Sequence, residues 1–422
     1  MSRPPVRYII SFLLVLFVSC AKAEIPEMVK DFYPETMNAV PPIPADLQEQ
    51  SISCNALHKG QPQHYKTSAE INYTAPQWQR RIQPEWQFFS ADQVSGRIVL
   101  IDYAYRENDT LAFRYLGNAN QFDQLYEPWS SSKIFAYSGA VSVLRTQSIG
   151  GTAYIGDVSI ADLITSIHSY QKTRQAPADS NAIATFFANI AGREFLTGLF
   201  HDKWLLMDNP DIRFRGAYGP HAYEPSAKIW LDGERRAELK HYEQASDDPN
   251  YQAYRCDQCG LTGNKPMTAL AQAEWLKRLA THDRVLETRH PGLMHEDIQT
   301  LFYGADGKGG MMAGISQMLH NALAAAIEPN SNDLPVDILN RNTQGQWRVF
   351  QKIGWGPSET RGAGENVVLA HVCLPHYRGG REFTLAAQTA QNGNGDIFVN
   401  YAGLKMQNLL TRSFIELLAV QD

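Results

Sequence analysis

A serine and a lysine that stand three residues apart, Ser130 and Lys133, have the types and spacing needed for acyl-transfer chemistry. Pro128 precedes them, and apolar residues recur at helical spacing through residues 134–144, so a buried helix is predicted to begin here. Residues three apart on a helix share a face, and the Lys133 amine can therefore reach the Ser130 hydroxyl. Apolar walls lower the pKa of a lysine, and the neutral amine can take the proton of a serine nucleophile.

The same spacing occurs at Ser19/Lys22 and at Ser169/Lys172, so it is a weak indicator when taken alone. The first copy lies in the leader sequence, and the last lies near the end of a predicted helix. Only Ser130 opens a long apolar helix. The competing interpretation of this serine is an ordinary helix cap followed by a surface lysine.

Two further polar clusters follow along the chain. Asp179-Ser180-Asn181 stands in a loop that leads into a predicted helix at residues 182–191. Lys352-Ile353-Gly354-Trp355-Gly356 ends a predicted strand, and residues 367–372 are its expected hairpin partner. The three clusters therefore begin a helix, occupy a loop and end a strand.

This ordered trio resembles the class A β-lactamase and D,D-peptidase superfamily, the penicillin-recognising serine enzymes, whose motifs are Ser-x-x-Lys, Ser-x-Asn and Lys-Thr-Gly. The resemblance covers roughly residues 95–420. It implies that Ser130 forms the acyl-enzyme, that Lys133 is its base and that Lys352 helps to bind a substrate carboxylate. It also implies an oxyanion hole made by the backbone N–H groups of Ser130 and Trp355, where each donor contributes about 3 kcal/mol. The remaining implied substrate-binding residues are Asn181 and Gly354, the latter because glycine lets the backbone approach the substrate.

Three departures from the family pattern change these expectations. The middle motif has Asp179 where the family has serine, so either Ser180 relays the proton to the leaving group, or Asp179 acts as a carboxylate paired to lysine, or both merely cap the helix. Ile353 has no hydroxyl, so carboxylate recognition must come from Ser358, Thr360 or Arg361. The family's deacylating Glu-x-x-Leu-Asn loop has no counterpart in residues 193–262. The acids of that stretch are expected on the surface: Glu224, Glu234 and Glu238.

The remaining sequence bounds the type of protein. The chain is 44% hydrophobic and 19% charged with a net charge of −6, which is typical of soluble globular proteins, and it has no basic run that would favour nucleic acid as a partner. Arg3 and Arg7 before the apolar residues 8–18, and the small residues at 21–23, predict a signal peptide over residues 1–23 and hence export. Residues 17–20 also resemble a lipoprotein box, so a lipid anchor at Cys20, in place of a free periplasmic form, is the alternative.

Removal of the predicted signal peptide leaves four cysteines, an even number that could pair as disulfides in an oxidising compartment. Cys256 and Cys259 are expected to form a loop disulfide, and the other two are Cys54 and Cys373. No cofactor or metal is expected. The histidines that could gather a metal are interpreted as residues of a polar loop: His282, His290 and His295.

The expected fold is α/β (α+β), with one antiparallel sheet built from both ends of the chain, flanking helices and an inserted helical subdomain at about residues 150–335. Residues 24–90 are predicted to be an extension that wraps the core, and residues 91–422 the β-lactamase-like domain. Predicted strands are 97–103, 111–115, 347–352, 367–372 and 383–387. Predicted helices are 158–171, 182–191, 194–200, 267–280, 311–327 and 405–419, with a polar insertion at 202–262.

These residues predict an exported serine hydrolase that forms an acyl-enzyme on Ser130 with an amide or ester, either a β-lactam or a peptidoglycan stem peptide, and that releases it slowly. The alternative is a non-catalytic, β-lactamase-like binding or scaffold protein of the cell envelope. Asp179 and Ile353 favour this alternative.

Overall fold

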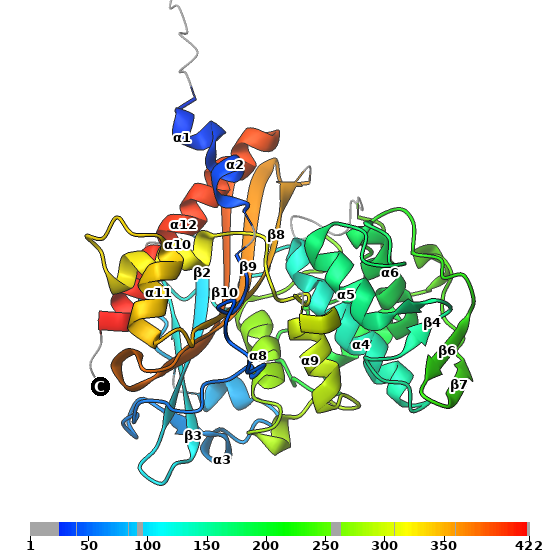
Figure 1. The fold of residues 1–422 in the computed structure, drawn as a ribbon, viewed down its shortest axis with the longest axis horizontal. Coiled ribbons are helices and arrows are strands. Elements are labelled where there is room, and N and C mark those ends of the chain that lie inside the picture. The colour runs from blue at the N-terminus through cyan, green and yellow to red at the C-terminus, as the bar shows by residue number, and fades with distance from the viewer. Residues whose placement is uncertain are drawn as a thin grey trace, which may run out of the picture.

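A six-stranded antiparallel sheet takes its strands from both ends of the chain (Figure 1). The computed structural model describes residues 25–419 except 39, 83, 91–95, 255–262, 308 and 359. The strand order is β1-β3-β2-β10-β9-β8. The strands are β1 (Lys66–Thr67), β2 (Arg97–Tyr105), β3 (Leu111–Gly117), β8 (Arg348–Ser358), β9 (Ala363–Leu374) and β10 (Arg381–Asn392).

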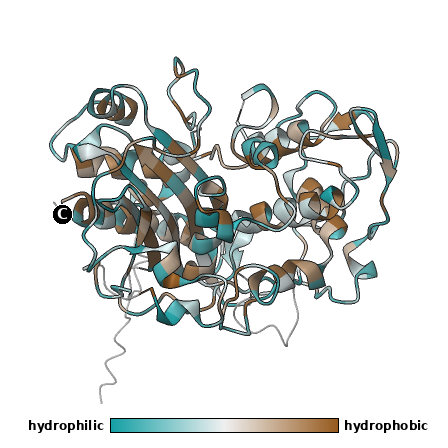
Figure 2. Cartoon of the chain, turned by 90° about the horizontal axis from the view of Figure 1, so that it is seen from below, coloured by the Kyte–Doolittle hydropathy of each residue, from teal (hydrophilic) through white to brown (hydrophobic). Residues whose placement is uncertain are grey.

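Both faces of this sheet are buried, and successive side chains of a strand point to opposite faces, so each strand contributes to two hydrophobic clusters. In β2, Val99 and Ile101 pack into one hydrophobic cluster together with helix α8 (Ala269–Ala280), whereas Ile98 and Leu100 pack into another. The second cluster is covered by α10 (Met318–Ile327), α11 (Pro335–Thr343) and α12 (Asp396–Ala419). Hydrophobic residues accordingly follow the strands in Figure 2. The five predicted strands are confirmed, and each is longer than predicted.

A helical part follows β3 and carries a second sheet that the sequence analysis missed. The predicted α/β fold with an antiparallel sheet built from both ends of the chain is confirmed, and a small sheet with the order β5-β4-β6-β7 is present in addition to it. The strands are β4 (Tyr154–Ile155), β5 (Val158–Ser159), β6 (Ile229–Asp232) and β7 (Arg235–Glu238). The helices are η2 (Trp129–Ser132), α4 (Lys133–Arg145), α5 (Ile160–Ser169), α6 (Ser180–Ala191), α7 (Arg193–Phe200) and α9 (His295–Tyr303). Half of this sheet therefore comes from the polar insertion.

The predicted helix at 311–327 begins only at Met318, and this difference has a local cause. Gly314 has a φ of +78°, in the left-handed region that interrupts a helix. The carbonyl of Met312 instead accepts a hydrogen bond from the Gln351 backbone N–H of β8, at 2.6 Å. The apolar residues before Met318 are thus buried as a cover for the sheet edge.

The N-terminal segment runs along the sheet after two short helices, α1 (Glu27–Lys30) and α2 (Phe32–Thr36) (Figure 1). Phe32 packs directly against Gly403 of α12. Further along, the Pro42 carbonyl accepts a hydrogen bond of 2.8 Å from the Val349 backbone N–H of β8. This segment therefore covers part of the sheet before it reaches β1. Two short helices lie between β1 and β2 in the chain: α3 (Ser68–Ile71) and η1 (Trp78–Arg80).

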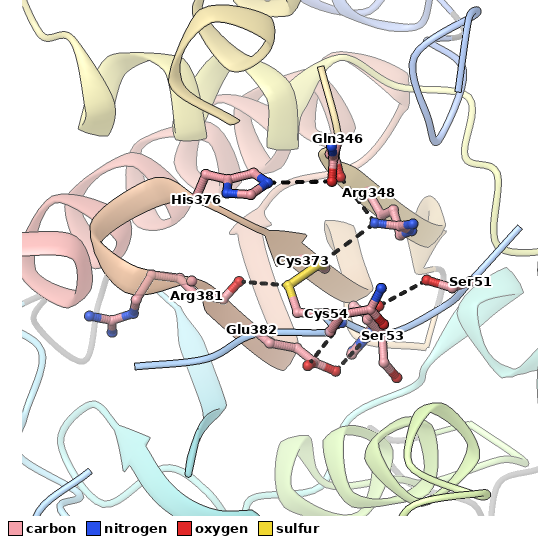
Figure 3. Close-up of a disulfide and its surroundings, with 12 residues drawn as sticks. Ser51, Ser53, Cys54, Gln346, Arg348, Cys373, His376, Arg381 and Glu382 are labelled. Atoms are coloured by element: carbon pink, nitrogen blue, oxygen red, sulfur yellow. Dashed lines mark hydrogen bonds and ion pairs between the residues drawn. A yellow bond between two sulfur atoms is a disulfide. The ribbon is translucent and has the colours of Figure 1, made fainter. Parts of the chain in front are cut away.

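A disulfide between Cys54 and Cys373 fastens this segment to β9 (Figure 3). The two Cα atoms are 5.5 Å apart, and the Cys54 backbone N–H also donates to the Glu382 carboxylate at 3.2 Å. The predicted Cys256–Cys259 disulfide and Cys20 lie outside the described residues. Within the described part of the chain, every helix is too short or too polar to cross a lipid bilayer.

Candidate active site

Ser130 stands in the tight turn η2 that precedes α4. Trp129 has a φ of +50°, which is costly for a bulky side chain and is a kind of strain that concentrates at functional sites. The hydroxyls of Ser131 and Ser132 close the turn by donating to the carbonyls of Pro128 and Trp129, at 2.5 and 2.7 Å. Two neighbouring serines thus hold the turn, and Ser130 is half-buried at its head.

The Lys133 amine is completely buried at the start of α4. It donates hydrogen bonds to Ser180 Oγ at 2.9 Å and to Asn181 Oδ1 at 2.8 Å. The rings of Tyr170 and Tyr218 lie 5.7 and 5.5 Å from it. Burial holds the pKa of Lys133 well below its usual value. A neutral amine, able to accept a proton, is therefore favoured at this position, one turn after Ser130.

Three nearby charges also act on the pKa of Lys133. The positive charges of Lys352 and Lys265 lower it further, and the negative charge of Asp179 opposes them. Lys265 itself is buried and forms an ion pair of 3.0 Å with Glu127, three residues before Ser130. This buried pair was missed in the sequence, and it places a second cation and its counter-charge behind the site.

The first two residues of the middle motif, Asp179 and Ser180, have different contacts. Asp179 is exposed, and its carboxylate accepts the backbone N–H groups of Asn181 and Ala182 at 3.1 and 2.9 Å, as a helix cap does. Ser180 is buried, donates to the Ile167 carbonyl at 2.8 Å and accepts from Lys133. The structure thus brings Ser180, rather than Asp179, into hydrogen-bond contact with the lysine.

The backbone of strand β8 contacts the backbone around Ser130 at Gly354. A Cβ atom at this position would lie 2.6 Å from the Ser130 backbone nitrogen, so only glycine permits this approach. Lys352 is buried two residues earlier, with its amine 5.9 Å from the Tyr170 ring. Ile353, on the opposite face, packs into the cluster under α10 and α12. Its lack of a hydroxyl therefore fits a core position.

The free edge of β8 presents backbone donors beside Ser130. The N–H groups of Val349 and Gln351 point out of this edge, because they bond to segments outside the sheet. The pairing of β8 with β9 continues without a bulge to Ser358, so the N–H of Trp355 points the same way. The N–H of Trp355 therefore lies on the residue next to Gly354, which contacts the Ser130 backbone nitrogen, and an oxyanion hole uses two backbone donors of this kind.

The residues expected to recognise a carboxylate lie farther along β8 and have partners of their own. Ser358 is buried and lies 3.3 Å from the Thr360 hydroxyl. Arg361 forms an ion pair with the buried Glu365, which also accepts from Trp129 Nε1 at 3.0 Å. Glu365 was missed in the sequence, although it stands four residues after the arginine. The Glu365 carboxylate therefore contacts both Arg361 and Trp129.

The three glutamates singled out in the polar insertion are exposed. Glu234 and Glu238 lie in the β6–β7 hairpin, and Glu224 lies in the loop before it. The expectation that they are surface acids agrees with these positions.

Replacing Gly354 with alanine tests the close approach of β8 to η2. The new methyl group would meet backbone on both sides, so we expect the unfolding free energy to fall by about 1–3 kcal/mol and covalent labelling of Ser130 to slow at least tenfold. Gly117→Ala is the matched control, because its Cβ would also crowd neighbours, 2.8 Å from the Trp86 ring, but on β3. Thermal melts and labelling rates separate the two effects. Equal labelling by both variants would contradict the assignment.

No protein-family model matches this sequence, and no curated protein matches it. Among solved structures, the chain is similar to the β-lactamase from Streptosporangium roseum, with 12% identity, coverage of 77% of this chain and 95% of the other, and a TM-score of 0.38. The class D β-lactamase YbXI from Nostoc has 15% identity, coverage of 77% and 94%, and a TM-score of 0.34. PBP-A has 9% identity, coverage of 77% and 90%, and a TM-score of 0.38. At identities of 9 to 15% this likeness concerns the fold alone and assigns no activity to the chain.

Proposed function

We propose that this protein is an exported serine hydrolase that forms an acyl-enzyme on Ser130 with an amide or ester substrate. The observation that carries the proposal is the buried Lys133 amine, held by Ser180 and Asn181 one turn from Ser130. A lysine in a dry site is the usual partner of a serine nucleophile that lacks histidine. The signal peptide predicted from residues 1–23 and the Cys54–Cys373 disulfide support export.

The proposed reaction begins with proton transfer from the Ser130 hydroxyl to the neutral Lys133 amine. Ser130 Oγ attacks the substrate carbonyl, and the N–H groups of Ser130 and Trp355 stabilise the negative charge on its oxygen. The carbon–nitrogen or carbon–oxygen bond then breaks, and Ser180 passes the proton held by Lys133 to the leaving group. A water molecule later cleaves the acyl-serine ester.

The substrate class follows from the charges beside the nucleophile. Lys352 is buried next to Tyr170, and its cation suits an anionic group of the substrate. Arg361 is paired with Glu365, which leaves Lys352 as the main cation proposed for that role. A β-lactam or a peptidoglycan-type peptide carries such a carboxylate.

Slow release of the acyl group is the expected result with a β-lactam. Rapid deacylation needs a positioned base, and Glu224, Glu234 and Glu238 of the insertion are exposed, while its buried acid, Asp248, is ion-paired with Arg193. With nitrocefin, we expect a burst equal to the enzyme concentration followed by a nearly flat phase. Intact mass should show the adduct, and peptide mapping should place it on Ser130. Steady hydrolysis at hundreds of turnovers per second, with no trapped adduct, would refute slow release.

A second candidate is a non-catalytic binding protein of the cell envelope. Two observations favour it: Asp179 serves as a helix cap, and Ile353 packs into the core. Incubation with benzylpenicillin and with a fluorophosphonate separates the candidates. A protein that acquires no mass from either reagent, yet remains folded, would support this second function.

A further inference from the structure

A cavity of about 510 Å³ lies beside the candidate site, between the N-terminal segment and the helical part. One wall is residues 40–50, including Ala45, Gln48 and Gln50. The opposite wall carries His168, at the end of α5, and Tyr303, at the end of α9. Its volume is in the usual range for small-molecule sites. No part of the mechanism above uses it.

The wall that comes from the N-terminal segment is fixed at both ends. Pro42 is hydrogen-bonded to Val349 of β8, and the Ser51 carbonyl accepts from the Tyr303 hydroxyl at 2.7 Å. Three residues later the Cys54–Cys373 disulfide fastens the segment to β9. A wall held in this way is preorganised, which lowers the entropic cost of binding a ligand against it.

The cavity lies in line with the nucleophile along the edge of β8. The segments beside the cavity bond to Val349 and to Gln351, through Pro42 and through Met312. Ser130 lies at Gly354, three residues beyond Gln351. At 3.3 Å per residue the two points are roughly 10 Å apart, about the length of three extended residues. One substrate of modest length can therefore occupy both places.

The cavity is also on the side to which the leaving group departs. Ser180, the proposed proton donor to that group, donates to the carbonyl of Ile167, the residue immediately before His168. Lys352 is close enough for its charge to act on His168. Atoms that leave beside Ser180 and pass Lys352 therefore meet the His168 side of the cavity.

The described lining favours an uncharged and partly apolar ligand. Proline, alanine and leucine side chains of residues 40–47 provide apolar surface, and Gln48 and Gln50 provide amide groups. Burial and the charge of Lys352 lower the pKa of His168 to about 4, so its ring is neutral at pH 7. Asp306 is ion-paired with Arg174. These are the features that recognise an amide-capped amino-acid residue.

We propose that this cavity is a binding subsite for an uncharged, amide-bearing extension of the leaving group, built by residues 40–50 and the His168 side of α5. The proposal rests on the proposed hydrolase function. It assigns to the N-terminal segment a role in substrate selection, because its chain forms half of the subsite.

Two thioesters with the same acetylalanyl group test the proposal. One has mercaptoacetamide as its leaving group, and the other has mercaptoacetyl-valinamide, so both leaving groups are uncharged and they differ only in length. In each reaction the Ser130 Oγ–carbon bond forms, the carbon–sulfur bond breaks and the thiol takes a proton from Ser180, so released thiol reports acylation. Water then cleaves the acyl-serine ester and restores the enzyme. We expect kcat/KM to be at least tenfold higher for the longer substrate.

Ala45→Trp fills the cavity from an exposed position of its wall, and Asp46→Trp adds the same ring to the neighbouring exposed residue, which is not part of the lining. We expect Ala45→Trp to lower kcat/KM for the longer thioester at least tenfold, mainly by raising KM, and to leave the shorter one within twofold. Asp46→Trp should change neither. A similar loss for both substrates, or equal effects of the two variants, would overturn the proposal.

Failure of the hydrolase function would be recognised separately, because the wild-type protein would then consume neither thioester and acquire no acyl mass. Binding of N-acetylvalinamide to Ser130→Ala protein, followed by NMR titration, then tests the cavity alone. Saturable binding that Ala45→Trp removes and Asp46→Trp retains supports the subsite. Absence of binding, or binding that survives Ala45→Trp, overturns it.

Discussion

Ser130→Ala protein is expected to acquire no covalent mass from benzylpenicillin or from a fluorophosphonate, while the wild-type protein acquires one equivalent of each. The reason is chemical: the variant keeps the turn, its closing bonds and the buried lysine, but it lacks the oxygen that would form the ester. Intact mass spectrometry measures the result directly. The folded state should be retained, because Ser131 and Ser132 close the turn.

Ser169→Ala is the matched control for this experiment. Ser169 also stands three residues before a lysine, Lys172, but it ends α5 instead of preceding a buried helix. Labelling of this control should equal that of the wild-type protein. Labelling that persists in Ser130→Ala, or that maps to Ser169, would end the assignment of the nucleophile.

Lys133→Met is expected to lower the rate of covalent labelling of Ser130 by about 10²- to 10⁴-fold, the usual contribution of a general base. The pH dependence in the wild-type protein should report the same group. Only the neutral amine accepts a proton, and the pKa of Lys133 is held well below its usual value, so the labelling rate should rise with pH through that lowered pKa and reach its plateau below the pH at which an ordinary lysine loses its proton. Rapid-mixing measurements of labelling against pH test both statements.

Replacing Lys133 should slow labelling without lowering the stability of the folded state. Between the lowered pKa of the folded state and the usual lysine pKa, the unfolded chain binds a proton that the folded chain does not, so this group destabilises the folded state increasingly as pH falls. Lys133→Met removes that cost, and the unfolding free energy at pH 7 should be unchanged or higher. Lys172→Met, at an exposed position, should alter neither rate nor stability. A Lys133→Met protein that labels as fast as the wild type would contradict the role of the lysine.

The sequence predicted the positions of the three motifs because each depends on local structure. Ser130 and Lys133 could be placed by helical spacing, and Lys352 and Gly354 by the apolar strand that carries them. Ser180 was kept as an alternative to Asp179, and the hydrogen bond to Lys133 now distinguishes their positions. That distinction depends on which of two adjacent residues caps α6, which a pattern alone leaves open.

Features that depend on distant contacts could not be predicted in this way. The Glu127–Lys265 ion pair joins residues that are far apart in the chain, and neither has a neighbour pattern that marks it. The segment around Met312, which covers the edge of β8, was predicted as part of a helix. An apolar run indicates that a segment is buried, but it does not indicate which secondary structure the segment adopts. One local signal was overlooked: Gly233-Glu234 is the two-residue loop that joins β6 to β7, and glycine at the first position of such a loop favours a hairpin.

The bond between Cys54 and Cys373 has a consequence for how the protein is made. The two cysteines are separated by 319 residues, so at 5–20 residues per second Cys54 leaves the ribosome roughly 15 to 65 s before its partner. Cys256 and Cys259 emerge during that interval, before Cys373. Any bond that Cys54 forms with one of them must be exchanged for the bond to Cys373, so recombinant production should improve when a disulfide isomerase is supplied together with the oxidant.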